Sequence, residues 1–263
     1  MNHINKKDLT APFSPTNVEI TIKQYIEKNG YKKLSIKSLL FDMDGVLYDS
    51  MPSHACSWVT VMRNNGFNMT EADAYLNEGR IGHDTIGLIA AREGKQVDIE
   101  ERKRIYQEKT KLFTSCPPIK PIHRSVDFVQ KITTAGLSAM LVTGSGQPSL
   151  LDQLNIDFPN VFTREKMVTS FDVKKGKPHP EPYLMALQKG GLQPSEAIVV
   201  ENAPLGVEAA CAAGLFVIAV NTGPLPDSVL FDAGANILFP SLEALSAQWD
   251  NFYVHTLSSL RPF

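Results

Sequence analysis

The spacing of apolar positions changes along the chain, and each change predicts a different kind of element. Apolar residues recur at helical intervals from 17 to 30, which predicts a short helix after a mobile polar tail over residues 1–16. Residues 34–41 predict the first strand, and the continuous apolar run at its end predicts burial on both faces. Helical spacing then continues without a convincing strand and predicts helices over 51–65, 70–78, 84–92 and 98–115.

The second half of the chain alternates between short apolar runs and helical patterns. The strands are predicted at 137–142, 167–168, 197–200 and 216–220, with helices over 125–135, 148–154, 180–189 and 205–213. This alternation is typical of a doubly wound, Rossmann-like α/β fold with a parallel sheet. The all-helical block is therefore predicted to be an insertion into that fold, and three prolines mark the chain's return from it. The predicted division is a tail and short helix at 1–34, a core domain at 35–50 and 121–263, and a helical cap at 51–120.

Composition narrows the class of protein. At 263 residues and 43% apolar, the chain can bury the core of one large domain with a smaller module. A net charge of −2 and a pI near 6.3 argue against nucleic acid or membranes as partners and favour a small ligand. Cys56, Cys116 and Cys211 lie far apart, which predicts free thiols in a reducing compartment. We expect a cytoplasmic monomer.

Two carboxylates follow the first strand directly. Asp42 and Asp44 are two residues apart, so an extended backbone points both to the same side, and Gly45 permits a sharp turn after them. Two such charges raise each other's pKa unless a cation lies between them. Taken alone, the pair is also compatible with an acidic surface turn.

Three later segments favour a site over a surface turn. Thr143–Gly146 offers a hydroxyl group and backbone N–H groups to an anion, and Lys177 lies just ahead of a predicted helix. Glu201 and Asn202 end another strand and carry the oxygen ligands that hard cations prefer. Each segment alone is an ordinary turn, basic loop or helix start. Together with the two aspartates, these segments place an acid, a hydroxyl group, a lysine and a second acid after successive strands of the predicted sheet.

The motif DxDGVLxDS at 42–50, with these three segments, resembles the haloacid dehalogenase (HAD) superfamily of phosphotransferases. The likeness is to the β-phosphoglucomutase-like branch and covers residues 37–251. It implies a HAD core with a helical cap after the first motif. It also implies that Asp42 is the nucleophile that forms an aspartyl phosphate, and that Asp44 is the general acid and base.

The resemblance assigns the remaining core residues as well. Thr143, Lys177 and the backbone groups of Gly144 and Ser145 would hold the phosphoryl oxygens. Many relatives carry aspartate where this chain has asparagine at 202. The metal is implied to be Mg²⁺, bound by the Asp42 carboxylate, the backbone carbonyl of Asp44 and the side chain of Asn202, with Glu201 compensating through waters.

Substrate choice is implied to come from the cap. Where mutases carry a lysine and an arginine for a second phosphate, this chain has Glu78 and Gly82, whereas His54 matches a histidine that mutases use. Glu78 would reach the metal or its waters over a small, highly charged substrate, or would be the solvated end of a cap helix. Arg80 would bind a distal phosphate or pair with an acid of the cap.

These cap residues leave more than one function open. The main expectation is a Mg²⁺-dependent phosphohydrolase acting on inorganic pyrophosphate, because the segments around Glu78, Thr143 and Glu201 look like a bacterial pyrophosphatase of this branch. The alternative is a β-phosphoglucomutase or a phosphatase of small sugar phosphates. A non-catalytic phosphate-binding module is the rival from another class, and it would be expected to lose Asp42 or Asp44, both of which are present.

Overall fold

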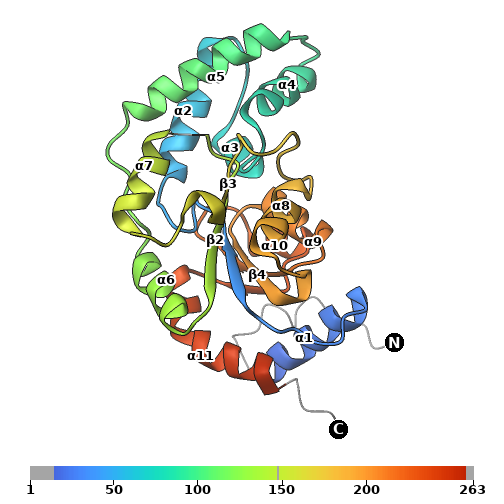
Figure 1. Ribbon diagram of the computed structural model, residues 1–263. Coiled ribbons are helices and arrows are strands. Elements are labelled where there is room, and N and C mark those ends of the chain that lie inside the picture. Colours follow the sequence, from blue (N-terminus) through green and yellow to red (C-terminus); the bar gives the residue numbers. More distant parts are fainter. Residues whose placement is uncertain (1–14, 147, 259–263) are drawn as a thin grey trace.

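A six-stranded parallel sheet forms the centre of the computed structural model, which describes residues 15–146 and 148–258 (Figure 1). The order β3-β2-β1-β4-β5-β6 places the first strand in the middle, paired in parallel with β2 and β4. The order reverses beside β1, which is where open α/β sheets bind ligands. The strands are β1 Ser38–Phe41, β2 Ser138–Val142, β3 Met167–Val168, β4 Ala197–Glu201, β5 Phe216–Val220 and β6 Ile237–Phe239.

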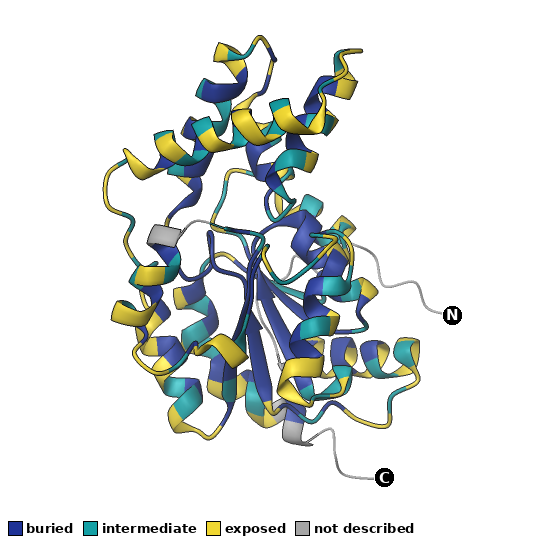
Figure 2. Ribbon diagram, turned by 45° about the horizontal axis from the view of Figure 1, so that its top comes forward, coloured by how far each residue is buried: buried dark blue, intermediate teal, exposed yellow. Residues whose placement is uncertain are grey.

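Helices cover both faces of the sheet because successive strand residues point to opposite sides. Leu39 and Phe41 belong to an apolar core shared with α1, α6, α7 and α11, whereas Leu40 belongs to one shared with α8, α9 and α10. Strands β1, β4 and β5 are buried along their whole length, and the outer helix faces are exposed (Figure 2). These helices are α1 Pro15–Asn29, α6 Ser125–Thr134, α7 Pro148–Asp157, α8 Glu181–Gly190, α9 Pro204–Ala212, α10 Asp227–Asp232 and α11 Leu242–Ser258, with 3₁₀ turns at Arg164–Lys166 and Pro194–Glu196.

The inserted helices form a cap with its own apolar core. This core is separate from the two that flank the sheet, and Figure 1 shows the cap lying beyond the carboxyl ends of the strands. Its two connections run side by side, because the Asp49 N–H donates to the Lys120 carbonyl at 3.0 Å and Tyr48 bridges to Pro121. The cap helices are α2 Met51–Asn64, α3 Glu71–Leu76, α4 Gly82–Arg92 and α5 Ile99–Thr114.

The expected fold class is confirmed, with corrections to several elements. The first helix begins at Pro15 rather than at residue 17, and residues 1–14 of the expected tail lie outside the described part. The first strand spans only Ser38–Phe41, because the Ser35 and Lys37 N–H groups donate to residues 195 and 196 ahead of β4. Helix α10, strand β6 and helix α11 were not predicted. Within the described residues, no helix is long and apolar enough to span a bilayer.

Candidate active site

The register of the sheet brings four of the predicted segments to one place. Phe41 is level with Leu141 of β2 and Val200 of β4, so the residues that follow these strands leave the sheet together. Lys177 arrives from the loop after β3, and its ammonium donates to Asp42 Oδ1 at 2.5 Å and to the Val142 carbonyl at 3.0 Å. Both side chains are buried. Sequence regions more than a hundred residues apart therefore meet above β1.

Glu201 holds Lys177 from the other side. Its Oε1 accepts from the Lys177 ammonium at 2.6 Å and from the Tyr183 hydroxyl at 3.1 Å. Its Oε2 accepts from the backbone N–H groups of Asn202 and Ala203 at 2.8 and 2.9 Å. Because both oxygens are occupied and the residue is fully buried, Glu201 positions the lysine and fixes the backbone between β4 and α9. This geometry does not favour the expectation that Glu201 contacts the metal through waters.

The charges at this site are unbalanced. Burial raises the pKa of Asp42 to about 8, and the Glu201 and Asp44 carboxylates add to the rise against the opposing effect of Lys177. Burial also raises the pKa of Glu78, with Asp42 and Glu201 adding to it. Although burial disfavours its charge, Lys177 keeps a raised pKa because Asp42 and Glu201 face it. The Lys177 ammonium contacts two buried carboxylates, those of Asp42 and Glu201, and the buried Glu78 adds a further carboxyl group close to them, an arrangement that a divalent cation would relieve.

Asn202 offers a ligand for such a cation. Its side-chain Oδ1 is buried and has no hydrogen-bond partner among the described residues, which is uncommon for a buried amide. No group of three or more histidine, cysteine or acidic side chains is arranged to hold a metal within the described ranges. The donors that fit are therefore of mixed type: a carboxylate, a backbone carbonyl and an amide oxygen. Such oxygen donors suit Mg²⁺.

Asp44 lies in a different environment from Asp42. The Ser50 hydroxyl donates to its Oδ1 at 2.5 Å, and His54 Nε2 lies 3.1 Å from the same oxygen. Lys109 Nζ lies 2.6 Å from the other ring nitrogen, His54 Nδ1. Burial favours a neutral Asp44, but His54, Ser50 and Lys109 outweigh it and lower the pKa. The expectation that the two aspartates raise each other's pKa therefore holds only for Asp42.

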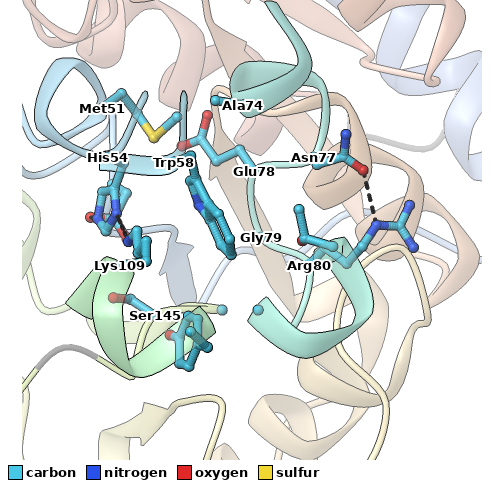
Figure 3. Close-up of a pocket in the computed structure, with 15 residues that line it drawn as sticks. Met51, His54, Trp58, Ala74, Asn77, Glu78, Gly79, Arg80, Lys109 and Ser145 are labelled. Carbon is cyan, nitrogen blue, oxygen red and sulfur yellow. Dashed lines mark hydrogen bonds and ion pairs between the residues drawn. The ribbon is translucent and has the colours of Figure 1, made fainter. Parts of the chain in front are cut away.

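Two predicted cap residues face this site. Glu78 is buried, and its carboxylate oxygens accept from Asn202 Nδ2 at 3.0 and 3.2 Å, so it is not a solvated helix end. Arg80 is half-buried, and its Nε donates to the Asn77 amide oxygen at 3.1 Å rather than to a cap acid (Figure 3). Both line a cavity of about 50 Å³ between cap and core.

The turn after β2 forms the opposite wall of the cavity. Thr143 is buried, and its hydroxyl accepts from the Ser145 N–H at 2.9 Å. Gly144 and Ser145 line the cavity together with Asp44, His54 and Glu78. In Figure 3, Ser145 lies across the cavity from Ala74 and Glu78. All predicted site residues are thus in this region. Those that do not line the cavity themselves are Asp42, Thr143, Lys177, Glu201 and Asn202.

Sequence reasoning missed two residues of the site. Lys109 lies on the charged helix α5, and nothing in that pattern separates it from the exposed lysines around it. Only the fold shows that its ammonium is buried under the rings of Trp58 and Phe113, at 5.4 and 4.9 Å from their centroids. Tyr183 occupies an ordinary apolar position of α8, and its hydroxyl gains a role only through Glu201.

Comparison with known proteins agrees with this geometry. Residues 39–220 match the model of the haloacid dehalogenase-like hydrolases. The chain belongs to the haloacid dehalogenase-like hydrolase family. This hydrolase is 31% identical to hexitol phosphatase A of Escherichia coli over 188 residues, covering 70% of this chain and 83% of the relative. It is 30% identical to a phosphorylated carbohydrates phosphatase of Thermotoga maritima over 224 residues, covering 80% and 97%.

A solved structure extends the likeness to nearly the whole hydrolase. The putative beta-phosphoglucomutase from Bacteroides vulgatus is 49% identical, has a TM-score of 0.89, and matches 95% of this chain and 100% of its own. The chain is thus a HAD-type hydrolase resembling β-phosphoglucomutase. The names of these three relatives mention carbohydrates, hexitols or glucose, and none mentions pyrophosphate. They favour the sugar-phosphate alternative over the main expectation.

Proposed function

We propose that this chain is a magnesium-dependent phosphohydrolase that cleaves small phosphorylated sugars or sugar alcohols. The observation that carries the proposal is the meeting of Asp42, Lys177 and Asp44 beside a small cavity beneath the cap. The names of the relatives supply the substrate class. Mg²⁺ would be held by the Asp42 carboxylate, the Asp44 backbone carbonyl and Asn202 Oδ1, and its charge would offset that of the transferred phosphoryl group.

In the first step, a carboxylate oxygen of Asp42 attacks phosphorus while the bond from phosphorus to the leaving oxygen breaks. Lys177 opposes the rise in the pKa of Asp42 and stabilises the negative charge on the phosphoryl oxygens. Thr143 and the N–H groups of the turn after β2 hold those oxygens from the opposite side. Asp44 gives its proton to the leaving oxygen, and the Asp42 aspartyl phosphate remains.

In the second step, water replaces the alcohol. Asp44 removes a proton from the water, which attacks the phosphorus, and inorganic phosphate leaves as the Asp42 carboxylate is restored. The first step leaves Asp44 ionised, the form that accepts this proton, and His54 and Lys109 stabilise that form. The cap excludes bulk water from the site during transfer.

Replacing the nucleophile tests the reaction class. Asp42→Asn should lower kcat by at least about 10³-fold, because an amide does not form the phosphoryl intermediate. Asp49→Asn is the matched control, since it makes the same change on an exposed carboxylate of the same motif. Rapid acid quench after mixing with ³²P-labelled substrate should trap label on the wild type and on Asp49→Asn. A fully active Asp42→Asn variant would rule out the nucleophile.

Pyrophosphate is the second candidate, and one contact favours it. Glu78 is buried against Asn202, so a cap carboxylate faces the proposed metal position, and the cavity of about 50 Å³ suits a compact substrate. Values of kcat/KM for hexitol phosphates, glucose 1-phosphate and pyrophosphate would rank the candidates, and formation of glucose 6-phosphate would reveal a mutase.

A cap substitution sharpens this comparison. If pyrophosphate is the substrate, Glu78→Ala should reduce its hydrolysis more than that of any ester, whereas the exposed Glu71→Ala should change neither. Equal losses on both substrate types would remove the specific link between Glu78 and pyrophosphate.

A further inference from the structure

Three glycines of the core lie where the cap meets it, and their backbone does not require glycine. Gly144 follows β2, Gly176 lies in the loop after β3, and Gly223 follows β5. None of them has a φ in the left-handed region, so another residue could adopt the same backbone conformation. Glycine is therefore required at these positions by the atoms around them and not by the backbone conformation.

The surroundings of all three glycines come from one segment of the cap. A Cβ on Gly144 would overlap the Gly79 carbonyl oxygen, and one on Gly176 would lie 2.7 Å from Ile81 Cγ1. A Cβ on Gly223 would lie 3.2 Å from Tyr75 Cδ1, which is tighter than an ordinary contact. Three separate core loops thus leave room for residues 75–81 of the cap.

Other glycines of the chain show the contrast. Gly30, Gly66, Gly94 and Gly136 have positive φ values and open space where a Cβ would lie, so they serve turns. Gly79, on the cap side, combines both reasons, because its φ is +83° and a Cβ would lie 2.7 Å from Lys177 Cδ.

We infer that Gly144, Gly176 and Gly223 form a docking seat that fixes the closed position of the cap and thereby determines substrate specificity. The inference rests on the proposed phosphohydrolase activity. With residues 75–81 in the seat, Glu78 reaches Asn202 and the space over the site is about 50 Å³. The closed enzyme therefore selects compact phosphorylated molecules that the cap can enclose. A side chain in the seat holds the cap away and relaxes this selection.

Gly176→Ala tests the seat through substrate preference. The methyl group displaces Ile81 by a fraction of an ångström to about 1 Å, and a misplacement of this size costs up to about 100-fold in rate. We expect kcat/KM for the best natural substrate to fall at least about tenfold, and that for p-nitrophenyl phosphate, whose good leaving group needs little help from a closed cap, to change less than about threefold. Gly87→Ala is the control, because its methyl group would meet only the flexible end of Arg102 within the cap.

A second substitution distinguishes a steric clash in the docking seat from a general loss of folding. Ile81→Ala removes the two side-chain atoms nearest to the new methyl group, so Gly176→Ala combined with Ile81→Ala should recover activity relative to Gly176→Ala alone. Gly223→Ala should act in the same direction with a smaller effect, and it replaces Gly176→Ala if that variant does not fold. A double variant no better than Gly176→Ala would overturn the inference.

Hydrogen exchange tests the seat without any substrate. Amides of residues 75–81 should exchange at least about tenfold faster in Gly176→Ala than in wild type, and those of α2 should not change. The double variant should return toward the wild-type rate. Unchanged exchange of 75–81 in Gly176→Ala would overturn the seat. If the wild type hydrolyses none of the tested phosphates, the proposed function fails, and this measurement still decides whether the seat exists.

Discussion

The buried Lys109 gives a quantitative prediction about stability and pH. Its side chain is 2% exposed, and its ammonium contacts His54 and two aromatic rings rather than a carboxylate. Burial lowers its pKa from 10.5 to about 7, against weaker opposing effects of Asp44 and Cys116. Lys109→Met keeps the approximate length of the side chain and removes its charge.

The direction of the effect follows from proton binding. Between about pH 7 and pH 10.5 the unfolded lysine is protonated and the folded one is largely neutral, so stability rises with pH in this window. Below about pH 7 both states carry the charge, and the full cost of burying it is present. The fall in pKa from 10.5 to about 7 corresponds to an upper limit of about 5 kcal/mol in the free energy of unfolding. We expect the measured change across the pH range to be about 2 to 5 kcal/mol.

Urea unfolding of wild type and Lys109→Met across about pH 6 to pH 10 measures this difference. The free energy of unfolding of the wild type, relative to the variant, should be lowest near pH 6 and should rise toward pH 10. Lys103→Met, at an exposed position of the same helix, should give a curve parallel to the wild type. Parallel curves for Lys109→Met as well would refute a depressed lysine pKa.

Three further substitutions test the site and the core. Tyr183→Phe leaves a buried carboxylate without one donor and should cost about 1–3 kcal/mol in urea unfolding, together with a loss of kcat. Gly45→Ala should cost about 1–2 kcal/mol through its φ of +78° and, because the methyl group would overlap Asn202, should also weaken Mg²⁺ binding in calorimetry. Trp249→Ala should lower stability by about 3–5 kcal/mol, whereas the exposed Ile156→Ala should change it by less than about 0.5 kcal/mol.

Much of the fold follows from local patterns. The change from helical spacing to alternation predicts the parallel sheet and the inserted cap. Because the carboxyl ends of parallel strands share one edge, it also predicts that Asp42, Thr143 and Asn202 lie in one region. The missed helix α11 had a readable signal, since Leu242, Leu245, Trp249 and Phe252 recur at helical intervals and are buried.

Other features depend on contacts that no local pattern contains. Residues 34–37 are apolar enough for a strand, but their N–H groups find partners outside the sheet ladder. Glu78 was equally compatible with a solvated helix end, and its burial follows only from the docked cap. Lys109 and Tyr183 acquire their importance from His54 and Glu201, which lie 55 and 18 residues away in the chain.

The paired connections between cap and core have a consequence for how such enzymes diversify. Tyr48 bridges to Pro121, and Leu47 accepts from the Ile122 N–H at 2.8 Å, so the chain leaves the core and re-enters it at neighbouring points. Replacing the residues between these two connections with another insertion, large or small, would leave the strands of the core in their positions. An exchange of this kind keeps both aspartates and Lys177 in place, whereas the residues that enclose the substrate and those that support Asp44 are replaced together.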